Sequence, residues 1–545
     1  MKKIAVLIAG AFLLANLAYA GGILTNTNQS AQFVRMLSRN ASTDLDAVYF
    51  NPAGLTQMKN GFYFGVHNQS IFQNRTINSE FPYLNENTYK GEVLAPVFPT
   101  AFAVYKLNNL AISAGFGPNG GGGSAKYNKG LPSFEKLISS IPMGLTSSGI
   151  PTTEYSSNIQ FEGSSVFWGA QFNGSYAIND IISISAGVRV IMANNTYNGY
   201  LKDIMINPKQ PAFGASYNGS MVSATEFFAA GNTFLKGMAT NSIAVSTGLS
   251  NAISGGTPAA TPLSALPATT VSAVTQLLGA AGISTTGMNI GTAAATLTAV
   301  AAGFNGSAAT METNSLATKD KTVDTKQTGT GFTPIIGIDI HMDKLNIGLK
   351  YEHQTTLKLT NATVVDGTGL FTDGEESRSD LPSIIAAGAD YMVTDKLKAS
   401  GSFNMYLDKN VNWGGNVYKQ ERTIDQNYIE MAFGLEYKLM DNFALSAGYL
   451  NSNTGVSEQY QSDFSYSNDS YTVGLGFQWN LSDRLVLDAG AMLTTYKDES
   501  KTFTADFDDL AKTFGPYNET YGKDTFTFAF GIGYQIMEFK SKRRR

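Results

Sequence analysis

Long segments of strict two-residue alternation constrain the fold of this chain most. In residues 471–481, one face is apolar and aromatic: Tyr471, Val473, Leu475, Phe477, Trp479 and Leu481. The other face is small or polar: Thr472, Gly474, Gly476, Gln478 and Asn480. Residues 525–536 repeat the pattern, with Phe526, Phe528, Phe530, Ile532, Tyr534 and Ile536 on the apolar face. Because successive side chains of a strand point to opposite faces, each segment predicts a two-faced β-strand.

Similar segments at 166–176, 345–351 and 433–439 raise the question of which β architecture they build. A soluble sandwich also alternates. Strands of about ten residues with an apolar face on one side are typical of outer-membrane barrels, in which that face meets lipid. The composition agrees, with 26 Tyr, 33 Phe, 55 Gly and only 15% charged residues. We therefore predict an all-β, antiparallel transmembrane β-barrel.

The connections between these segments predict the number of strands. Short turns that carry Asp or Asn occur at 106–109, 177–180, 341–344, 393–396, 440–442 and 481–484. Longer polar loops lie near 73–95, 119–153, 199–328, 362–378, 408–425, 452–467 and 498–522. Six short turns that alternate with seven long loops give 14 strands, an even number, across residues 61–539. Barrels of this class place the short turns in the periplasm and the long loops outside the cell.

The N-terminus predicts export. Lys2 and Lys3 precede an apolar run at 4–14, and Ala18-Tyr19-Ala20 forms a small-x-small cleavage site, so residues 1–20 read as a signal peptide. The run is too short to cross a bilayer core of about 30 Å, and no later run of about 18 apolar residues predicts a transmembrane helix. The absence of cysteine fits an exported chain, and a net charge of −5 gives no reason to expect nucleic acid as a partner. We expect a bacterial outer-membrane location.

Three segments depart from the barrel pattern. Residues 21–60 lack sustained alternation, and irregular backbone is costly in hydrocarbon, so we predict an N-terminal plug in the lumen. The third long loop, about 199–328, needs structure of its own, and helix-compatible runs at 233–253 and 263–278 predict a partly helical extracellular cap. Residues 540–545 form a basic C-terminal tail after Phe539, which we read as a solvated end.

The third strand contains a break. Alternation ends near Gly115, and Gly117, Pro118, Asn119 and Gly120 then begin a run that ends in four consecutive glycines. Proline cannot donate to the ladder and glycine permits a bend, so lost pairing here would leave a gap in the wall. The alternative is an ordinary glycine-rich loop. The spacing of Gly115, Gly117 and Gly120 also matches a dinucleotide fingerprint, but no strand–helix unit surrounds it.

Two motifs carry a resemblance to a known family. Asp46-Ala47-Val48-Tyr49-Phe50-Asn51-Pro52-Ala53-Gly54-Leu55 in the plug and Gly115-Phe116-Gly117-Pro118-Asn119-Gly120 in the third strand resemble the FadL/TodX outer-membrane transporters of hydrophobic compounds. The resemblance implies passive uptake of long-chain fatty acids or other hydrophobic compounds such as hydrocarbons, delivered through a lateral opening at the third-strand kink. The third loop is larger than that resemblance requires.

Several residues receive roles with alternatives. Asn51, Pro52 and Ala53 form a turn whose movement opens a path, or a static turn that holds the plug to the wall. Ile23 and Leu24 put an apolar side chain into a lumenal pocket, or belong to a frayed end. Arg189 is a partner for a substrate carboxylate or, as we prefer, a lumenal arginine paired with an acidic residue.

No catalytic arrangement is predicted. The histidines are His67, His341 and His353, and the spacing of His67 and Ser70 puts them on opposite faces of a strand. No metal-ligand spacing is present, so we expect no enzyme activity, metal or cofactor. We expect a monomer surrounded by outer-membrane lipid. A surface adhesin or structural barrel that binds a partner through the third loop, and a general porin, are the alternative functions.

Overall fold

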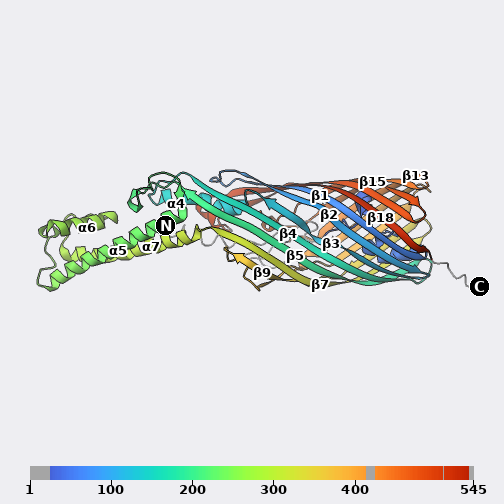
Figure 1. The fold of residues 1–545 in the computed structure, drawn as a ribbon, viewed down its shortest axis with the longest axis horizontal. Coiled ribbons are helices and arrows are strands. Elements are labelled where there is room, and N and C mark those ends of the chain that lie inside the picture. The colour runs from blue at the N-terminus through green and yellow to red at the C-terminus, as the bar shows by residue number, and fades with distance from the viewer. Residues whose placement is uncertain (1–24, 413–423, 507, 539–545) are drawn as a thin grey trace, which may run out of the picture.

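The computed structural model describes residues 25–412, 424–506 and 508–538, which form a closed antiparallel barrel with a helical arm at one end (Figure 1). Eleven strands are unbroken: β1 (Gly61–Ser79), β2 (Thr88–Leu107), β3 (Leu110–Tyr127), β4 (Tyr155–Ala177), β5 (Ile182–Ile206), β7 (Lys321–Met342), β12 (Leu397–Tyr406), β13 (Tyr428–Met440), β14 (Phe443–Asn453), β15 (Ser470–Ser482) and β18 (Tyr517–Glu538). Three are interrupted: β8 (Leu345–Glu352) with β9 (Lys358–Asp366), β10 (Glu376–Arg378) with β11 (Ile384–Met392), and β16 (Leu485–Tyr496) with β17 (Glu499–Phe503). The predicted 14-stranded barrel is confirmed, and β1 closes it by pairing with both β2 and β18.

The alternating faces point as predicted. The apolar set of β15 faces outward, with Leu475 60% exposed, whereas Thr472 on the opposite face is 4% exposed. The phenylalanines of β18 are likewise on the outer surface. This is the arrangement of a sheet that meets lipid outside and a filled lumen inside.

The strands are longer than the expected ten residues or so. β1 has 19 residues, β5 has 25 and β18 has 22. Because about 9–11 tilted residues cross the hydrocarbon, the strands continue past the membrane on the loop side. The loops expected at 73–95 and 199–328 therefore shrink to 80–87 and 207–320. The sequence missed the extension of β7 because residues 321–330 are polar apart from Val323 and Gly329, so the ladder continues where the alternation stops. The extension of β5 at 199–206 was missed because its apolar and polar residues have no two-residue period.

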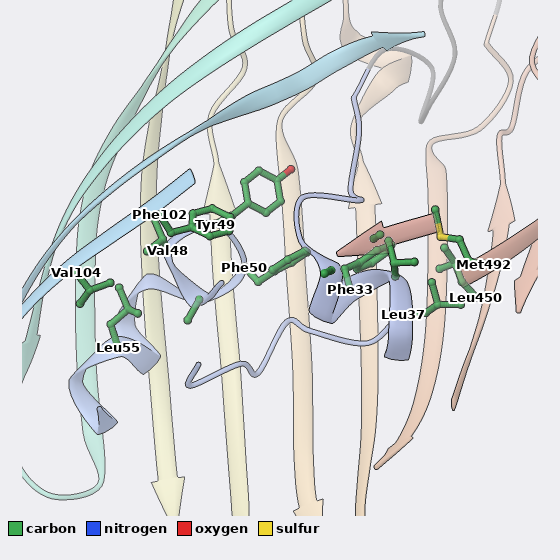
Figure 2. Close-up of a cluster of buried hydrophobic side chains, with 14 of the residues drawn as sticks. Phe33, Leu37, Val48, Tyr49, Phe50, Leu55, Phe102, Val104, Leu450 and Met492 are labelled. Atoms are coloured by element: carbon green, nitrogen blue, oxygen red, sulfur yellow. The ribbon is translucent and has the colours of Figure 1, made fainter. Parts of the chain in front are cut away.

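The plug lies inside the barrel (Figure 2). Its elements are α2 (Ala31–Met36), α3 (Ala47–Phe50) and the 3-10 turn η1 (Pro52–Gln57). Plug side chains share one buried apolar cluster with barrel residues; the cluster includes Phe33, Leu37, Val48, Tyr49, Phe50, Leu55, Phe102, Val104, Leu450 and Met492. The prediction of a lumenal plug is confirmed.

Lumen-facing glycines let the plug helix approach the wall. A Cβ on Gly474 would lie 2.5 Å from the carbonyl oxygen of Val34, and one on Gly490 would lie 2.8 Å from the backbone nitrogen of Arg35. A Cβ on Gly448 would overlap the carbonyl of Met36. The small face of the alternating strands is therefore small because α2 occupies the space beside it.

The large loop forms a helical arm that projects beyond the barrel (Figure 1). It contains β6 (Val222–Ser223), α5 (Ala224–Ser254), α6 (Ala268–Ala280) and α7 (Ile290–Ala317), with short 3-10 turns η2 (Pro211–Phe213) and η3 (Leu263–Ala265). The predicted run 233–253 lies in α5, and 263–278 covers η3 and part of α6. α7 was missed, because its Ala-, Thr- and Gly-rich sequence has no strong apolar stripe. None of the helices in the described residues is long and apolar enough to span a membrane.

Further helices close the mouth of the barrel. α4 (Pro132–Ser147) follows β3, and α8 (Asp509–Phe514) precedes β18. Phe134 of α4 makes edge contacts with Phe161 of β4 and Phe464 of the loop between β14 and β15. The η4 (Asp408–Asn410) and η5 (Glu458–Tyr460) turns belong to the neighbouring loops. α4 therefore packs against a buried aromatic cluster at the loop end of the barrel.

Candidate ligand path through the barrel wall

The ladder between β2 and β3 is interrupted. Val93 pairs with Ala125 and the pairing resumes only at Ala101 with Phe116, so residues 94–100 of β2 have no ladder partner in β3. β2 carries Pro96 and Pro99 in this stretch, which cannot donate to a ladder. The carbonyl oxygen of Pro96 accepts hydrogen bonds from Ser70 Oγ at 2.8 Å and Asn68 Nδ2 at 3.2 Å instead. The wall is therefore unpaired between β2 and β3 in this stretch, although β2 keeps its ladder with β1.

The predicted kink residues lie at this break. Gly115 still pairs with Phe102, so it stands just before the interruption. Gly117, Pro118, Asn119 and Gly120 are buried on the lumen side, where the strand leaves the wall. The irregular run continues past Gly120, because Gly121 and Gly123 have φ values of +85° and +76° that favour glycine. β3 keeps its pairing to β4 with shifts in register, so the strand bends inward as part of that sheet.

The start of the described chain is bound to the kink. Thr25 forms an isolated bridge with Gly120, and the backbone N–H of Asn26 donates to the Asn119 carbonyl at 2.9 Å. Gln29 Nε2 donates to the Pro118 carbonyl at 2.8 Å. Residues 25–29 thus satisfy the polar groups that β3 loses when it leaves β2. Ile23 and Leu24 lie outside the described residues, as do Phe539 and the basic tail.

A cavity of about 150 Å³ adjoins the break. The plug side of its lining includes Asn26, Asn28 and Phe33. The wall side includes Ile71, Ala95, Phe98, Gly121, Gly122, Gly123, Leu450, Met492 and Lys523. A smaller cavity of about 30 Å³ lies next to it and shares Gln73, Gly122 and Gly123. The kink therefore borders partly open space inside the barrel, lined by polar as well as apolar side chains.

The Asn-Pro-Ala turn is tied to the wall. Asn51 Nδ2 donates to Asp339 Oδ1 on β7 at 2.7 Å. The Pro52 carbonyl accepts from Ser175 Oγ on β4 at 2.6 Å, and Thr56 Oγ1, which donates to the Ala53 carbonyl, also lies 2.6 Å from Ser183 Oγ on β5. These bonds join the turn to three neighbouring strands of the wall.

Lumenal cations fall into two groups. Arg189 is paired with Glu352 at 2.6 Å and 3.0 Å, which agrees with the preferred reading of that residue. Arg75 on β1 and Lys523 on β18 face one another in the ladder and make no ion pair among the described residues. Sequence reasoning missed this second pair because its members meet only when the first and last strands close the barrel.

The wall has a second interruption, where residues 329–334 of β7 lose their partners between β8 and β9. It is bridged, because the His353 N–H donates to the Pro334 carbonyl at 2.9 Å and the hydroxyls of Thr333 and Thr355 are in contact. Leu357 and Leu359 behind it are buried in an apolar cluster. The break between β2 and β3 is the one that borders the larger cavity.

The histidines lie in separate environments. His67 is buried beside Phe102 and accepts from the Ala31 N–H at 3.4 Å. His341 contacts Asn346, and His353 contacts Tyr351. Within the described part of the chain, no group of three or more carboxylates and histidines is placed to hold a metal ion.

Comparison with known proteins extends this description. A family model described as the β-barrel of TonB-dependent receptor-like proteins matches residues 275–540. No curated protein matches the chain by sequence. A FadL homologue from Pseudomonas aeruginosa is similar in structure with a TM-score of 0.56 and 13% identity, over 95% of this chain and 100% of that chain. A deltaS2S3 mutant of the monoaromatic hydrocarbon channel TodX has a TM-score of 0.50 and 12% identity, over 93% and 99%. This chain therefore has the fold of the FadL-like outer-membrane β-barrels.

Proposed function

We propose that this protein takes up hydrophobic compounds passively across the outer membrane, through the plugged lumen and out through the β2–β3 break. The observation that carries the proposal is the unpaired stretch of β2 beside the larger cavity. An apolar molecule that leaves the lumen sideways reaches lipid without crossing the polar layer on the far side. The solved FadL homologue and TodX mutant have the same fold, and the latter is named a monoaromatic hydrocarbon channel.

The proposed route starts at the aromatic cluster at the loop end of the barrel. Phe134 packs edge-on against Phe161 and Phe464, and the last two line the smaller cavity, where a ligand gains roughly 25 cal/mol per Å² of apolar area removed from water. The ligand then occupies the larger cavity and leaves past Gly121–Gly123, where Val97 on the outer face of β2 is 70% exposed. The proposed route uses no energy source, so the ligand diffuses along it down its concentration gradient.

The proposed mobile part is the stretch 25–29. These residues seal the kink through a few hydrogen bonds, whereas the Asn-Pro-Ala turn is bonded to three strands. We therefore assign the static role to Asn51, Pro52 and Ala53, and displacement to the segment at Thr25–Gln29.

The cavity bears on ligand size. A dry cavity of about 150 Å³ in another protein holds benzene. The cavity here has that volume, so it suits one aromatic ring or a short alkyl group. A long-chain fatty acid, the substrate that the family resemblance implies, needs additional room, which displacement of residues 25–29 provides.

A disulfide across the break tests the route. A Cβ on Gly123 would lie 3.7 Å from the Ala95 Cβ, which is within the range for a disulfide, and the chain has no other cysteine. The Ala95→Cys/Gly123→Cys variant should lose uptake of labelled toluene and 1-decanol when oxidised and regain it in reducing agent. Each single-cysteine variant controls for the strain at Gly123. Equal uptake by the oxidised and reduced forms rules out this exit.

The helical arm supports a second candidate, partner binding at the cell surface. Its tip has a buried core of its own, which includes Leu249, Leu278 and Leu297, and the stretch 237–311 carries no charged residue. Asn232 Nδ2 donates to the Ala308 carbonyl at 2.7 Å, so these two residues lie beside one another on α5 and α7. A linker that replaces residues 233–307 therefore removes the outer part of the arm and rejoins the two helices at this contact. If uptake persists in this variant while adhesion is lost, the arm has a separate role; loss of uptake assigns it to transport. A porin, in contrast, requires ion conductance in planar bilayers.

A further inference from the structure

Two aromatic side chains stand at one margin of the β2–β3 break, on the outer face of the barrel. Phe116 is the last residue of β3 that pairs with β2 before the break, and it is 44% exposed. Trp168 on β4 is partly exposed on the same face, two residues from the register partner of Phe116. The two rings are stacked, with their centres 5.3 Å apart and their planes 5° from parallel. We call this pair the aromatic margin.

β3 withdraws from the outer face beside Trp168. The register partner of Trp168 on β3 is Pro118, which is buried. All of residues 117–121 are buried as well, so the outer face of β3 has no exposed side chain between Phe116 and Gly122. The break therefore lies directly beside the exposed part of the aromatic margin.

The opposite margin of the break is aliphatic. Leu94 of β2 is 59% exposed and Val97 is 70% exposed, and both lie in the stretch that has no ladder partner in β3. Ala95 and Phe98 from the same stretch line the larger cavity inside the barrel. A molecule that passes through the break therefore meets alkyl side chains on one side and two aromatic rings on the other.

The aromatic margin lies at the border of the lipid-facing band. One ladder row joins Phe116 to Phe332 of β7 through β4 and β5. The outward residues of β7 are Thr328 and Thr330 on the loop side of Phe332, and apolar residues between 334 and 342 on the other side. Barrels carry aromatic side chains at this border whatever they transport. The contact with the break, and not the depth in the membrane, is therefore what distinguishes this pair.

Stacking is the interaction that the aromatic margin adds for a ligand in lipid. Lipid tails are as apolar as leucine, so an alkyl chain gains little when it leaves them for the protein surface. An aromatic ring gains more, because offset-stacked and edge-to-face contacts between rings are favourable beyond the area that they bury. Phe116 and Trp168 are already stacked, so a third ring extends an existing arrangement. The margin therefore favours aryl compounds over alkyl compounds.

We propose that Phe116 and Trp168 form a lipid-side binding site for the aromatic ring of a ligand that leaves through the β2–β3 break. The site holds flat aryl compounds at the exit and leaves alkyl compounds to the surrounding lipid. This inference rests on the proposed uptake function, because the break is what connects this face to the lumen. Neither residue lines the larger cavity, so the two act as positioning residues for the exit.

Tryptophan quenching in the full chain, in a non-ionic detergent, tests the site. The chain has tryptophans at 168, 413 and 479. Trp413→Phe/Trp479→Phe keeps Trp168, and Trp168→Phe/Trp413→Phe keeps Trp479, which is 42% exposed on the outer face of β15 beside Phe443. Bromobenzene and 1-bromohexane, which have the same number of carbons, are the aryl and alkyl quenchers. The aryl-to-alkyl ratio of quenching should be about threefold higher at Trp168 than at Trp479.

Variants of the protein that keeps Trp168 separate the site from general partition into detergent. Phe116→Leu removes the ring and keeps the outer face apolar, so the ratio should fall about threefold, to the value at Trp479. Phe116→Tyr retains a ring and should retain the ratio. Phe172→Leu, at an exposed position on the same face of β4, is the matched control and should leave the ratio unchanged.

A high ratio at Trp168 that falls in Phe116→Leu and persists in Phe172→Leu supports the site. Equal ratios at the two tryptophans, an unchanged ratio in Phe116→Leu, or the same fall in both leucine variants overturns it. Failure of the uptake proposal is distinguishable, because the cysteine cross-link is measured by transport of toluene and 1-decanol, whereas this site is measured by binding on the outer face.

Discussion

Asn51 Nδ2 donates a 2.7 Å hydrogen bond to Asp339 Oδ1, which joins the Asn-Pro-Ala turn of the plug to β7. Both side chains are buried, with exposures of 1% and 0%. Asp339 Oδ1 also accepts from Asn346 Nδ2 at 2.8 Å, and that amide donates in turn to the Ala41 carbonyl. The turn is therefore part of a polar network that fixes the plug to the wall.

Loss of this bond should weaken the plug. Asn51→Ala leaves the buried Asp339 carboxylate short of a donor, so we expect about 1–3 kcal/mol lower stability in urea unfolding followed by tryptophan fluorescence. Asn109→Ala, which removes a bond to the Ala177 carbonyl at an exposed turn, should change it by less than about 0.5 kcal/mol. Uptake should be retained in both variants. Increased uptake by Asn51→Ala with unchanged stability contradicts the static role.

Arg35 should be a stronger anchor. Its Nε donates to Asp488 at 3.0 Å, and Nη1 contacts Glu436 in a second ion pair. Arg35→Met leaves Asp488 buried without its cation, so we expect a loss of about 3–5 kcal/mol in the same measurement. The control is Lys236→Met, whose pair with Glu312 at 3.2 Å is exposed and should contribute less than about 1 kcal/mol. Similar losses of stability in the two variants contradict the role of Arg35 as an anchor of the plug.

The lumen-facing glycines beside α2 should not tolerate a larger side chain. Gly448→Ala puts a methyl group against the Met36 carbonyl, a backbone group that cannot turn aside. We expect about 1–3 kcal/mol of destabilisation and raised ion conductance in planar bilayers, because α2 must shift inward. Gly401→Ala adds the same methyl group on the barrel where no atom lies within 4 Å, and should have neither effect. Equal behaviour of the two alanine variants contradicts close approach as the reason for the glycine.

We expect the stability of the protein to depend on pH through Asp463, in the loop between β14 and β15. Burial raises the pKa of its carboxyl from 3.8 to about 6, and the nearby Glu519 adds to the rise. Between about pH 4 and 6 the unfolded chain has lost this proton while the folded chain keeps it, so this contribution to stability falls as pH rises, by at most about 3 kcal/mol, and levels off above 6.

Asp463→Asn should remove that contribution and still accept the hydrogen bond from the Ser133 N–H, which donates to the aspartate at 2.7 Å. Unfolding in urea at pH 4.5, 6.0 and 7.5 measures it as the difference between wild type and variant. Identical pH profiles for the two proteins contradict the raised pKa.

Much of the barrel was predictable because membrane strands obey local rules. The alternation in 471–481 and 525–536 identifies the lipid-facing side, and the turn and loop pattern gives the strand number. The true strand lengths were not predictable in this way, since the extensions of β5 and β7 alternate in neither size nor polarity. The helix α7 was not predicted for a related reason. Packing against α5 stabilises it more than an apolar stripe of its own.

The features of the candidate site were likewise predictable from the sequence only in part. Gly117, Pro118 and Gly120 are visible in the sequence as breaks in a strand, because proline and glycine act on their own backbone. The seal by residues 25–29 is not visible, since it joins two segments whose separation in the chain says nothing of their distance. The lack of ladder partners for residues 94–100 is likewise visible only from the register of β2 against β3.

The sequence by itself determined the two-faced strands, the plug segment and the kink, because each follows from the chemistry of neighbouring residues. The tertiary structure alone decided which charges meet. Arg75 and Lys523 lie near opposite ends of the chain, and they become ladder partners only because the barrel closes between β1 and β18. Closure brings two cations into one buried place and leaves the acidic residues nearby bonded to other groups, and no local pattern in the chain encodes that outcome.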